Sequence, residues 1–236
     1  MHGWRWARLR ERTKQTATGR TLEFEVPRWP GHLPGQHVDV RLTADNGYQA
    51  VRSYSLAAPA DTDRIELGIQ AAIGGEVSPY LADDLPVGAE VEVKGPLGGW
   101  FVWTPQDRGP LLLIAGGSGV VPLMAMLRAR LASVSDDPCA LLYSVRDPDE
   151  VWYATELDAA GDAVGVRLLY TRTVPDGSER PAGRMTELDL PTLPTLPSPA
   201  DARCYVCGPT GFVEHAGALL LAAGYAPDQI RTERFG

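Results

Sequence analysis

Cysteine and histidine are scarce in this chain of 236 residues, which contains three cysteines and four histidines. An odd, low number of cysteines does not build the disulfide framework of a small secreted domain. The histidines are scattered along the sequence, without the HExxH spacing or a similar ligand pattern. We therefore expect neither a disulfide scaffold nor a bound metal. The four histidines are His2, His32, His37 and His215.

Long apolar runs and an excess of positive charge are also missing. The longest apolar run, Ala218–Ala223, is far shorter than the roughly 20 residues of a membrane-spanning helix. The first residues lack the charged and then apolar plan of a signal peptide. The net charge is −8, whereas a nucleic-acid-binding domain usually presents a basic face. These absences predict a cytoplasmic protein that neither spans a membrane nor binds nucleic acid.

The first half of the chain has the pattern of a small β domain. Up to about Trp103, short β-type runs alternate with glycine and proline, which is typical of a barrel or a sandwich. One brief helix is expected at Ser78–Asp83, with Ser78 as its N-cap and Pro79 at its first position. The expected strands are Gly19–Val26, Val38–Leu42, Arg64–Gln70 and Glu90–Val93.

From about Gly109 strands alternate with helices, which predicts a parallel α/β sheet. The run Leu111–Ala115 is apolar throughout, as expected of a strand buried on both faces. Further strands are expected at Ala140–Val145, Val166–Tyr170 and Arg203–Cys207, and helices at Pro122–Leu131, Trp152–Ala159 and Gly211–Ala223, the last closed by Gly224.

Two irregular stretches complete this organisation. The Thr104–Gly109 stretch, with a proline and charged residues, is a natural linker, so we divide the chain into domains at residues 1–105 and 106–236. The proline-rich stretch Arg172–Asp201 is expected to be a surface loop around one short helix near Met185–Leu188.

A glycine-rich turn, Ala115–Pro122, lies between the first buried strand of the second half and the helix after it. Glycines let the backbone turn tightly and approach a phosphate, and the helix N-terminus offers free N–H groups and a positive dipole end. Pro122 in the first helical turn costs no hydrogen bond. Because Pro122 replaces the third glycine of the dinucleotide fingerprint, a tight structural turn is the alternative interpretation.

Two further motifs lie in the first half. In Arg52–Ser55, the arginine matches a pyrophosphate with a planar donor fork, and Tyr54 offers a face to a flat ring. Ser55 can hydrogen-bond a ring nitrogen. Gly74–Ser78 is a second candidate anion cradle before the short helix. The alternatives are an exposed strand end for the first and a hairpin turn for the second, but two cradles, one in each half, favour a ligand with phosphates.

Five motifs together resemble the ferredoxin–NADP reductase superfamily, in the order found there and over nearly the whole chain. That resemblance implies an N-terminal antiparallel β-barrel that binds FAD and a C-terminal α/β domain that binds a nicotinamide nucleotide. The motifs are Arg52-x-Tyr54-Ser55, Gly75-x-Val77-Ser78-x-x-Leu81, Gly95-Pro96-Leu97-Gly98, Gly116-Gly117-x-Gly119-x-x-Pro122 and Cys207-Gly208-Pro209.

The resemblance also implies roles for single residues. Arg52 would bind the flavin pyrophosphate, Tyr54 would lie against the isoalloxazine ring, and Ser55 would hydrogen-bond near its reactive nitrogen. The residues expected to bind FAD are Arg52, Ser53, Tyr54, Ser55, Gly74, Gly75, Val77, Ser78 and Phe235. The residues expected to bind the nucleotide include Gly117, Gly119, Val120, Pro122, Cys207, Gly208 and Pro209.

The end of the chain, Thr232–Gly236, is similar to that of superfamily members in which an acidic residue and an aromatic reach back to the flavin. Glu233 and Phe235 are the candidates, and a frayed terminus is the alternative. With Ser55 and Cys207, Glu233 completes the set of expected catalytic residues.

The choice of nicotinamide depends on the loops after the second and third strands of the α/β half. Ser144 and Arg146 follow the second strand and Arg172 follows the third. A 2′-phosphate needs cationic and hydroxyl partners, whereas a bare ribose usually meets an acidic residue. We favour NADPH over NADH, although Asp147 and Asp149 lie close by and the arginines could equally be solvated.

The pair Cys204 and Cys207 forms a CxxC, but residues three apart on a strand point to opposite faces, about 10 Å apart. That distance excludes a thioredoxin-like disulfide. The spacing of a plant-type iron–sulfur domain is absent, so the one-electron acceptor would be a separate molecule. Alternating cations at Arg8, Arg10, Arg12 and Lys14 would place four positive charges on one strand face, either for docking an acidic partner or as a solvated strand.

The sequence therefore predicts a reductase that transfers a hydride from NADPH to FAD and then single electrons to a ferredoxin, a cytochrome or an oxygenase component. Two alternatives stay open: a flavin reductase that uses flavin as a diffusible substrate, and a non-enzymatic flavin-binding subunit.

Overall fold

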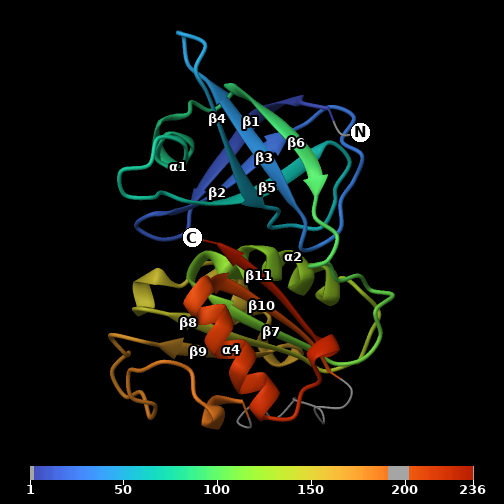
Figure 1. Cartoon of the computed structure of the whole chain (residues 1–236), viewed down its shortest axis with the longest axis vertical. Coiled ribbons are helices and arrows are strands. Elements are labelled where there is room, and N and C mark those ends of the chain that lie inside the picture. Colours follow the sequence, from blue (N-terminus) through green and yellow to red (C-terminus); the bar gives the residue numbers. More distant parts are fainter. Residues whose placement is uncertain (1–2, 191–201, 236) are drawn as a thin grey trace. The chain divides into compact units, whose positions relative to one another are not determined.

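The computed structural model describes residues 3–190 and 202–235. Contacts group the chain into two compact units, residues 1–104 with 124–130 and residues 105–123 with 131–236. Each unit is built around its own sheet (Figure 1), the first antiparallel and the second parallel. This confirms the predicted fold class of a β-barrel domain followed by an α/β domain.

The N-terminal unit is a six-stranded antiparallel sheet in the order β4-β3-β6-β1-β2-β5. A bridge between Leu56, just after β4, and Leu67 of β5 joins the two outer strands, so the sheet curls into a barrel. Alternating apolar side chains such as Leu22 and Phe24 fill its interior. The strands are β1 (Arg5–Lys14), β2 (Gly19–Glu25), β3 (His37–Thr43), β4 (Gln49–Ser55), β5 (Arg64–Gln70) and β6 (Glu90–Leu97).

The cation stripe expected on one face of β1 is wrong. A β-bulge just before Glu11 shifts the register with β2 and ends the alternation. Arg12, beyond the bulge, donates instead to the main-chain carbonyls of Leu81 and Leu85. The two cations before the bulge are neutralised by ion pairs, Arg8 with Glu90 and Arg10 with Glu25.

The short helix of the barrel unit differs from the prediction at its start. Helix α1 (Val77–Pro79) continues directly into a π-helical turn, Tyr80–Asp84. Ser78 lies inside the helix and is not its N-cap, because its Oγ accepts a hydrogen bond from the Ala72 N–H, 3.0 Å away. The hydroxyl therefore ties the preceding loop to the helix.

The C-terminal unit is a five-stranded parallel sheet in the order β11-β10-β7-β8-β9. The apolar run predicted at its centre is buried along its whole length as β7. The strands are β7 (Leu111–Gly116), β8 (Cys139–Val145), β9 (Gly165–Tyr170), β10 (Arg203–Pro209) and β11 (Ile230–Phe235). The helices of this half of the chain are α2 (Val120–Leu131), whose residues 124–130 group with the first unit, α3 (Ala154–Ala159) and α4 (Thr210–Ala222).

Three details of this unit differ from the sequence prediction. Strand β11 was not expected, and helix α3 begins two residues later than predicted, after Tyr153 in a left-handed conformation with φ 57°. In the proline-rich stretch, a 3₁₀ turn lies at Glu187–Asp189, where Arg180 holds the buried Asp189 in a bidentate ion pair. The rest of that predicted loop, residues 191–201, lies outside the described residues.

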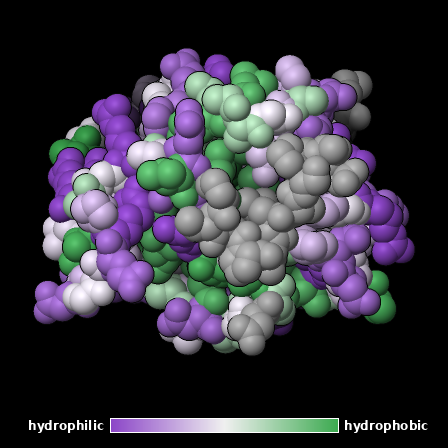
Figure 2. Space-filling view, turned by 90° about the horizontal axis from the view of Figure 1, so that it is seen from below, coloured by the Kyte–Doolittle hydropathy of each residue, from purple (hydrophilic) through white to green (hydrophobic). Residues whose placement is uncertain are grey.

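Within the described residues, no helix is long and apolar enough to cross a membrane. In the face shown in Figure 2, hydrophilic residues gather mainly at two sides, with hydrophobic residues between them.

Candidate flavin and nucleotide sites

The end of strand β4 presents the Arg52–Ser55 motif. In the register with β3, Arg52 lies opposite Val40 and Tyr54 opposite Val38, so these two side chains share one face of the sheet. Arg52 is exposed, and its guanidinium donates only to the neighbouring Val51 carbonyl, without an ion pair among the described residues. A planar cationic fork is therefore available for an anion.

Tyr54 connects this strand to helix α1. Its ring is half-buried and packs against the barrel core. Burial raises the pKa of Tyr54 to about 12, while the Arg52 charge and a hydrogen bond with Ser78 act to lower that pKa. The phenol is consequently neutral at physiological pH. Arg52, Tyr54 and Ser78, predicted separately from two motifs, thus lie together in the structure.

The turn before α1 is open where a ligand would approach. Gly74 has φ +72°, and a Cβ there would meet nothing within 4 Å. Gly75 is more enclosed, since its Cβ would lie 3.2 Å from the Ala72 carbonyl oxygen, to which its own N–H donates. Val77 is buried and anchors the turn in the core. This geometry leaves the N-terminal turn of the helix accessible on one side, as an anion cradle requires.

The second cradle is formed by the backbone at the end of β7. A 3₁₀ turn, Gly117–Gly119, connects β7 to α2, and Pro122 lies in the first turn of that helix as predicted. At Gly117, φ is +55° and the space around a Cβ is open. At Gly119, a Cβ would lie 2.2 Å from the Cys207 carbonyl oxygen. Val120 is buried beneath the turn.

Two more glycines bring β7 and β10 together at this end. A Cβ on Gly116 would lie 2.6 Å from the ring of Phe212, and a Cβ on Gly208 would lie 2.8 Å from the same ring. The turn therefore requires glycine at three positions because backbone and an aromatic ring occupy the space of a side chain. Pro209 is exposed at the end of β10.

The order of the strands places the carboxyl ends of β7 and β10 at the switch point of the sheet. At this point the chain stops adding strands on one side of β7 and begins to add them on the other. The chain runs from β7 outward to β8 and β9, then returns to place β10 on the other side of β7. In open parallel sheets, ligands bind outside the carboxyl ends of the strands at this switch point. The turn at Gly117–Gly119 follows β7, and Cys207–Pro209 are the last residues of β10.

Cys207 is buried, and its thiol has low reactivity because it stays protonated. Burial first, and then the charge of Glu233, raise the pKa of its thiol well above the usual range. Burial also raises the pKa of Cys204 to about 12. All three cysteines, including the two of the CxxC, are free and buried in the structure. The Cys207 thiol is a small neutral group and not a nucleophile.

The predicted C-terminal residues lie on an ordered edge strand. In β11, Glu233 lies opposite Cys207 and Phe235 opposite Pro209 of β10. Burial raises the pKa of Glu233 to about 7. Phe235 is 38% exposed, so its ring is accessible. An acid that titrates near neutrality and an accessible aromatic thus lie at the same sheet edge as Cys207.

The residues predicted to select the nicotinamide lie at the ends of the next two strands. Ser144 is buried opposite Gly116, and the N–H of Arg172 donates to the Arg146 carbonyl at 3.0 Å. The Arg146 side chain is exposed and 3.8 Å from Glu150. The exposed Arg172 side chain has no ion-pair partner among the described residues. Two guanidinium groups are thereby carried on neighbouring backbone segments.

Comparison with known proteins identifies the family of each half of the chain. The family described as oxidoreductase FAD-binding domain matches residues 7–102, and the oxidoreductase NAD-binding domain matches residues 113–217. A ferredoxin–NAD(P)⁺ reductase component of naphthalene 1,2-dioxygenase/salicylate 5-hydroxylase systems from a Ralstonia species is 32% identical over 218 residues. The chain belongs to the ferredoxin–NADP reductase superfamily.

Solved structures show the same fold. The FAD/NAD-binding domain of nitric oxide dioxygenase from Vibrio cholerae O1 biovar El Tor has a TM-score of 0.86 at 24% identity, with 98% of each chain covered. A cytochrome P450 reductase from Amycolatopsis has a TM-score of 0.84 at 26% identity and covers all of this chain and 71% of its own. The match to the Ralstonia reductase covers 92% of this chain but only 64% of the relative.

The residues present fit the two groups that the superfamily binds. Arg52, which has no ion-pair partner in the described part of the chain, and the open turn at Gly74 suit the pyrophosphate of FAD. The open turn at Gly117 suits the phosphates of a nicotinamide nucleotide. Sequence reasoning missed Phe212 and His37, the latter opposite Ser55 in β3. Neither belongs to a motif, and only the close approach of Phe212 to Gly116 or the strand register makes their positions evident.

Proposed function

We propose that this chain is a reductase that takes a hydride from NADPH onto FAD and delivers electrons singly to a separate acceptor. The observation that carries this proposal is the pair of open phosphate cradles, one in each domain, at Arg52 with Gly74 and at Gly117. A protein that binds both nucleotides brings a hydride donor and a flavin into one molecule. FAD, when bound, converts the two-electron hydride into one-electron steps.

The residues of the chain position the reactants. Arg52 and the turn before α1 hold the flavin pyrophosphate, while the neutral Tyr54 offers an apolar face to the flavin ring. Ser55 would donate a hydrogen bond near the reactive nitrogen of the flavin. On the nucleotide side, Cys207 presents an uncharged thiol, which leaves the charge on the nicotinamide ring unperturbed. Binding and orientation of this kind are the protein's contribution to hydride transfer.

NADPH is proposed as the donor because Arg146 and Arg172 are carried on hydrogen-bonded neighbouring segments. Arg172 is exposed and without an ion pair in the described residues, so it can bind a 2′-phosphate at little cost. Asp147 and Asp149, exposed or half-exposed nearby, are the feature that would favour NADH instead.

The acceptor is proposed to be a ferredoxin, a cytochrome or an oxygenase component. The names of relatives support the last of these, since the Ralstonia protein is a reductase component of dioxygenase systems and another, from Pseudomonas aeruginosa, is a glycine betaine monooxygenase reductase subunit. A cytoplasmic location stays a prediction from the sequence.

Anaerobic stopped-flow absorbance tests the proposal. The purified chain is loaded with FAD, gel-filtered, and mixed with NADPH or with NADH. We expect the flavin to be retained and its absorbance to bleach faster with NADPH. In Arg172→Ala, the preference for NADPH should fall by roughly 10-fold, about the value of one charge-assisted hydrogen bond.

Each alternative has its own outcome in this experiment. Loss of FAD on gel filtration, with turnover of added flavin, would show a flavin reductase that uses flavin as a diffusible substrate. Retained FAD that neither nucleotide bleaches would show a flavin-binding subunit. If the flavin bleached faster with NADH, and this preference were unchanged in Arg172→Ala, only the choice of NADPH would be overturned.

A further inference from the structure

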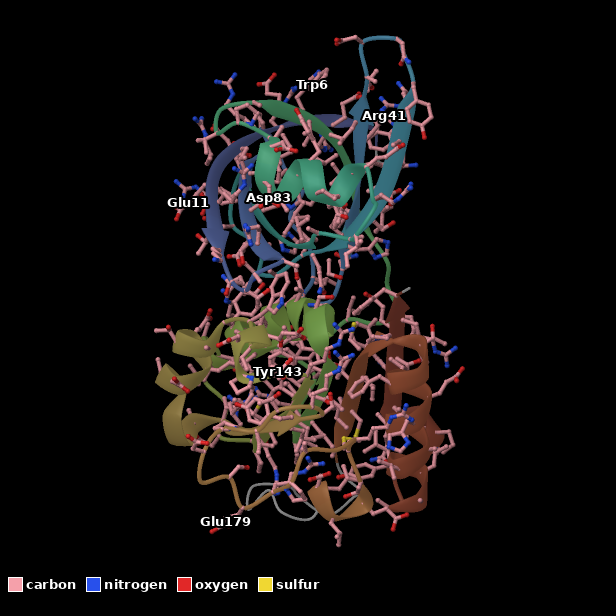
Figure 3. The ribbon with its side chains drawn as sticks, turned by 90° about the vertical axis from the view of Figure 1, so that its left-hand side faces the viewer. Trp6, Glu11, Arg41, Asp83, Tyr143 and Glu179 are labelled. Carbon is pink, nitrogen blue, oxygen red and sulfur yellow. The ribbon has the colours of Figure 1, made fainter. Side chains whose placement is uncertain are left out.

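The barrel unit contains a cavity that the proposed function does not use. Its volume is about 600 Å³, within the range of small-molecule sites. It is lined by the end of β3 and the residues after it, by the start of β6, by Trp6 of β1 and by the helical turn around Tyr80. Among the described residues that line it, none is proposed to bind FAD or the nucleotide. Figure 3 shows Trp6 and Arg41 at the same end of this unit.

Three neighbouring strands place one row of side chains along the cavity. Trp6 of β1 lies opposite Glu92 of β6, and Glu92 lies opposite Arg41 of β3. Residues directly opposite each other point to the same face of a sheet, so the indole, the carboxylate and the guanidinium are neighbours. The Trp6 side chain is 60% exposed, so most of its ring is available to a ligand.

The π-helical turn supplies an apolar part of the wall. The Leu85 N–H donates to the Tyr80 carbonyl at 2.7 Å, a spacing of five residues. In an α-helix, two side chains five residues apart would point about 140° apart. The wider π turn reduces that angle, so Tyr80 and Leu85 both line the cavity, and such turns are frequent at functional sites. Leu85 is buried together with Val91, whereas Tyr80 is exposed and presents its ring.

The ionic groups of the lining favour a positively charged ligand. The Arg41 guanidinium is already held by Glu92, with 2.8 Å between Nε and Oε2, and Glu90 is paired with Arg8 at 2.9 Å. Asp45 also lines the cavity, is exposed, and has no ion-pair partner in the described part of the chain. An anion would meet three carboxylates and one guanidinium that is already engaged, whereas a cation would meet the carboxylate of Asp45.

We propose that this cavity binds a small organic cation with an apolar body, such as an aromatic or alkyl amine. The apolar body packs on the rings of Trp6 and Tyr80 and over Leu85, which removes apolar surface from water. The ammonium group lies near Asp45, and the faces of the two aromatic rings attract it as well. The inference is independent of the proposed reductase activity, because no residue proposed to bind FAD or the nucleotide takes part.

Isothermal titration calorimetry of the full chain with FAD present tests the cavity with two probes of similar shape and opposite charge. Tryptamine carries an ammonium group on an indole ring, and indole-3-propionate carries a carboxylate on the same ring. We expect tryptamine to bind with a Kd of roughly 1 mM or tighter, as for a ligand of about twelve heavy atoms. Indole-3-propionate should bind about 10-fold more weakly or worse, because like charges repel it.

Two substitutions locate the bound amine. Trp6→Ala should weaken tryptamine binding by about 5-fold or more, since it removes an aromatic face. Asp45→Asn should narrow the difference in Kd between the two probes by roughly 2- to 5-fold, the value of an exposed ion pair. Trp100→Ala and Asp61→Asn replace exposed residues of the same unit that do not line the cavity. These matched controls should bind both probes as the wild type does.

Trp6→Phe separates binding from folding, because it keeps an aromatic face and should retain most of the affinity for tryptamine. Equal affinity for the two probes would overturn the proposal, and so would the absence of any heat of binding from tryptamine. Wild-type affinity in Trp6→Ala would overturn it as well, because the amine would then bind elsewhere on the chain. The same conclusion would follow if Trp6→Phe bound tryptamine no better than Trp6→Ala.

Discussion

The two proposed phosphate cradles differ in which atoms would bind the ligand: side-chain atoms in the barrel unit and main-chain atoms in the α/β unit. In the barrel unit, the proposed binding groups are side chains, with the Arg52 fork and the Tyr54 ring on one face of β4 and the Ser78 hydroxyl close by. In the α/β unit, the proposed binding groups belong to the backbone, and Gly116 and Gly119 are needed because β10 and Phe212 leave no room for a side chain. A substitution can therefore abolish ligand binding in the barrel unit without disturbing the fold. In the α/β unit, a substitution that abolishes binding would disturb the fold as well.

The largest effect is expected for Gly119→Ala, which tests the backbone cradle. The new Cβ would lie 2.2 Å from the Cys207 carbonyl oxygen and 2.7 Å from the Gly208 nitrogen, so main chain would have to move. We expect a loss of stability of about 3 kcal/mol or more and loss of nucleotide binding. Urea unfolding and nucleotide titration would measure both. Figure 3 labels Tyr143, whose side chain lies within this same unit.

Gly117→Ala is the matched control for this steric argument. Its Cβ would meet nothing within 4 Å, and only the φ of +55° is unfavourable for alanine. We expect a cost of about 1–2 kcal/mol, the usual strain of a left-handed residue. Equal destabilisation by the two substitutions would show that conformation, and not the approach of β10, dictates glycine at position 119.

An intermediate effect is expected for Arg52→Ala, which tests the side-chain cradle. Among the described residues, the only hydrogen bond of the guanidinium is to the Val51 carbonyl, so the fold should be unchanged. Loss of charge-assisted hydrogen bonds to a pyrophosphate should weaken FAD binding by roughly 10- to 100-fold. Flavin fluorescence on titration with the apoprotein measures the affinity. Arg52→Lys keeps the charge but not the planar donor fork, so its FAD affinity should lie between those of the wild type and Arg52→Ala.

If Arg52→Ala lowered the unfolding midpoint of the FAD-free protein as much as Gly119→Ala does, the contrast between the two cradles would fail. Arg20→Ala serves as a control for loss of an arginine from the same unit. Arg20 Nη2 lies 2.8 Å from Oδ1 of Asp83, the residue of the π-helical turn that is labelled in Figure 3. Arg20 takes no part in the proposed FAD site. We expect it to leave FAD affinity unchanged.

In the parallel sheet, the sequence predicts the fully apolar strand β7 best and misses β11 at one edge. β7 is apolar along its length, so its burial is evident from composition alone. β11 carries Arg231, Glu233 and Arg234, because an edge strand is partly solvated, and its polar sequence hides it. On β1, a bulge that no residue type announces reverses the facing of Arg12.

The candidate sites also contain residues that the sequence indicates and residues whose positions only the structure gives. The residue types of the Arg52–Ser55 and Gly117–Gly119 segments indicate an anion, because few other uses need a free arginine or a glycine turn before a helix. The predicted N-cap at Ser78 was wrong because a loop N–H competes for its hydroxyl. The position of His37 beside Ser55 depends on strand register, which pairs residues far apart in the sequence.

A stabilising effect, opposite in sign to the others, is expected for Glu233→Gln in the α/β unit. Burial raises the pKa of Glu233 from 4.5 to about 7. The folded state therefore binds a proton more tightly than the unfolded state, so the carboxyl lowers stability as pH rises between these two values and its cost is complete above about pH 7.

Glu233→Gln removes that cost, so the variant should be more stable than the wild type by about 1–3 kcal/mol near pH 8, with little difference near pH 4. Urea unfolding at both pH values measures this, with Glu214→Gln on the exposed side of α4 as the control. A wild type that equals the variant at pH 8 would mean that Glu233 is solvated when ionised. Stabilisation of the variant at pH 8 would show that the fold keeps an acid opposite Cys207 at a cost to stability, as expected of a residue retained for the proposed reaction.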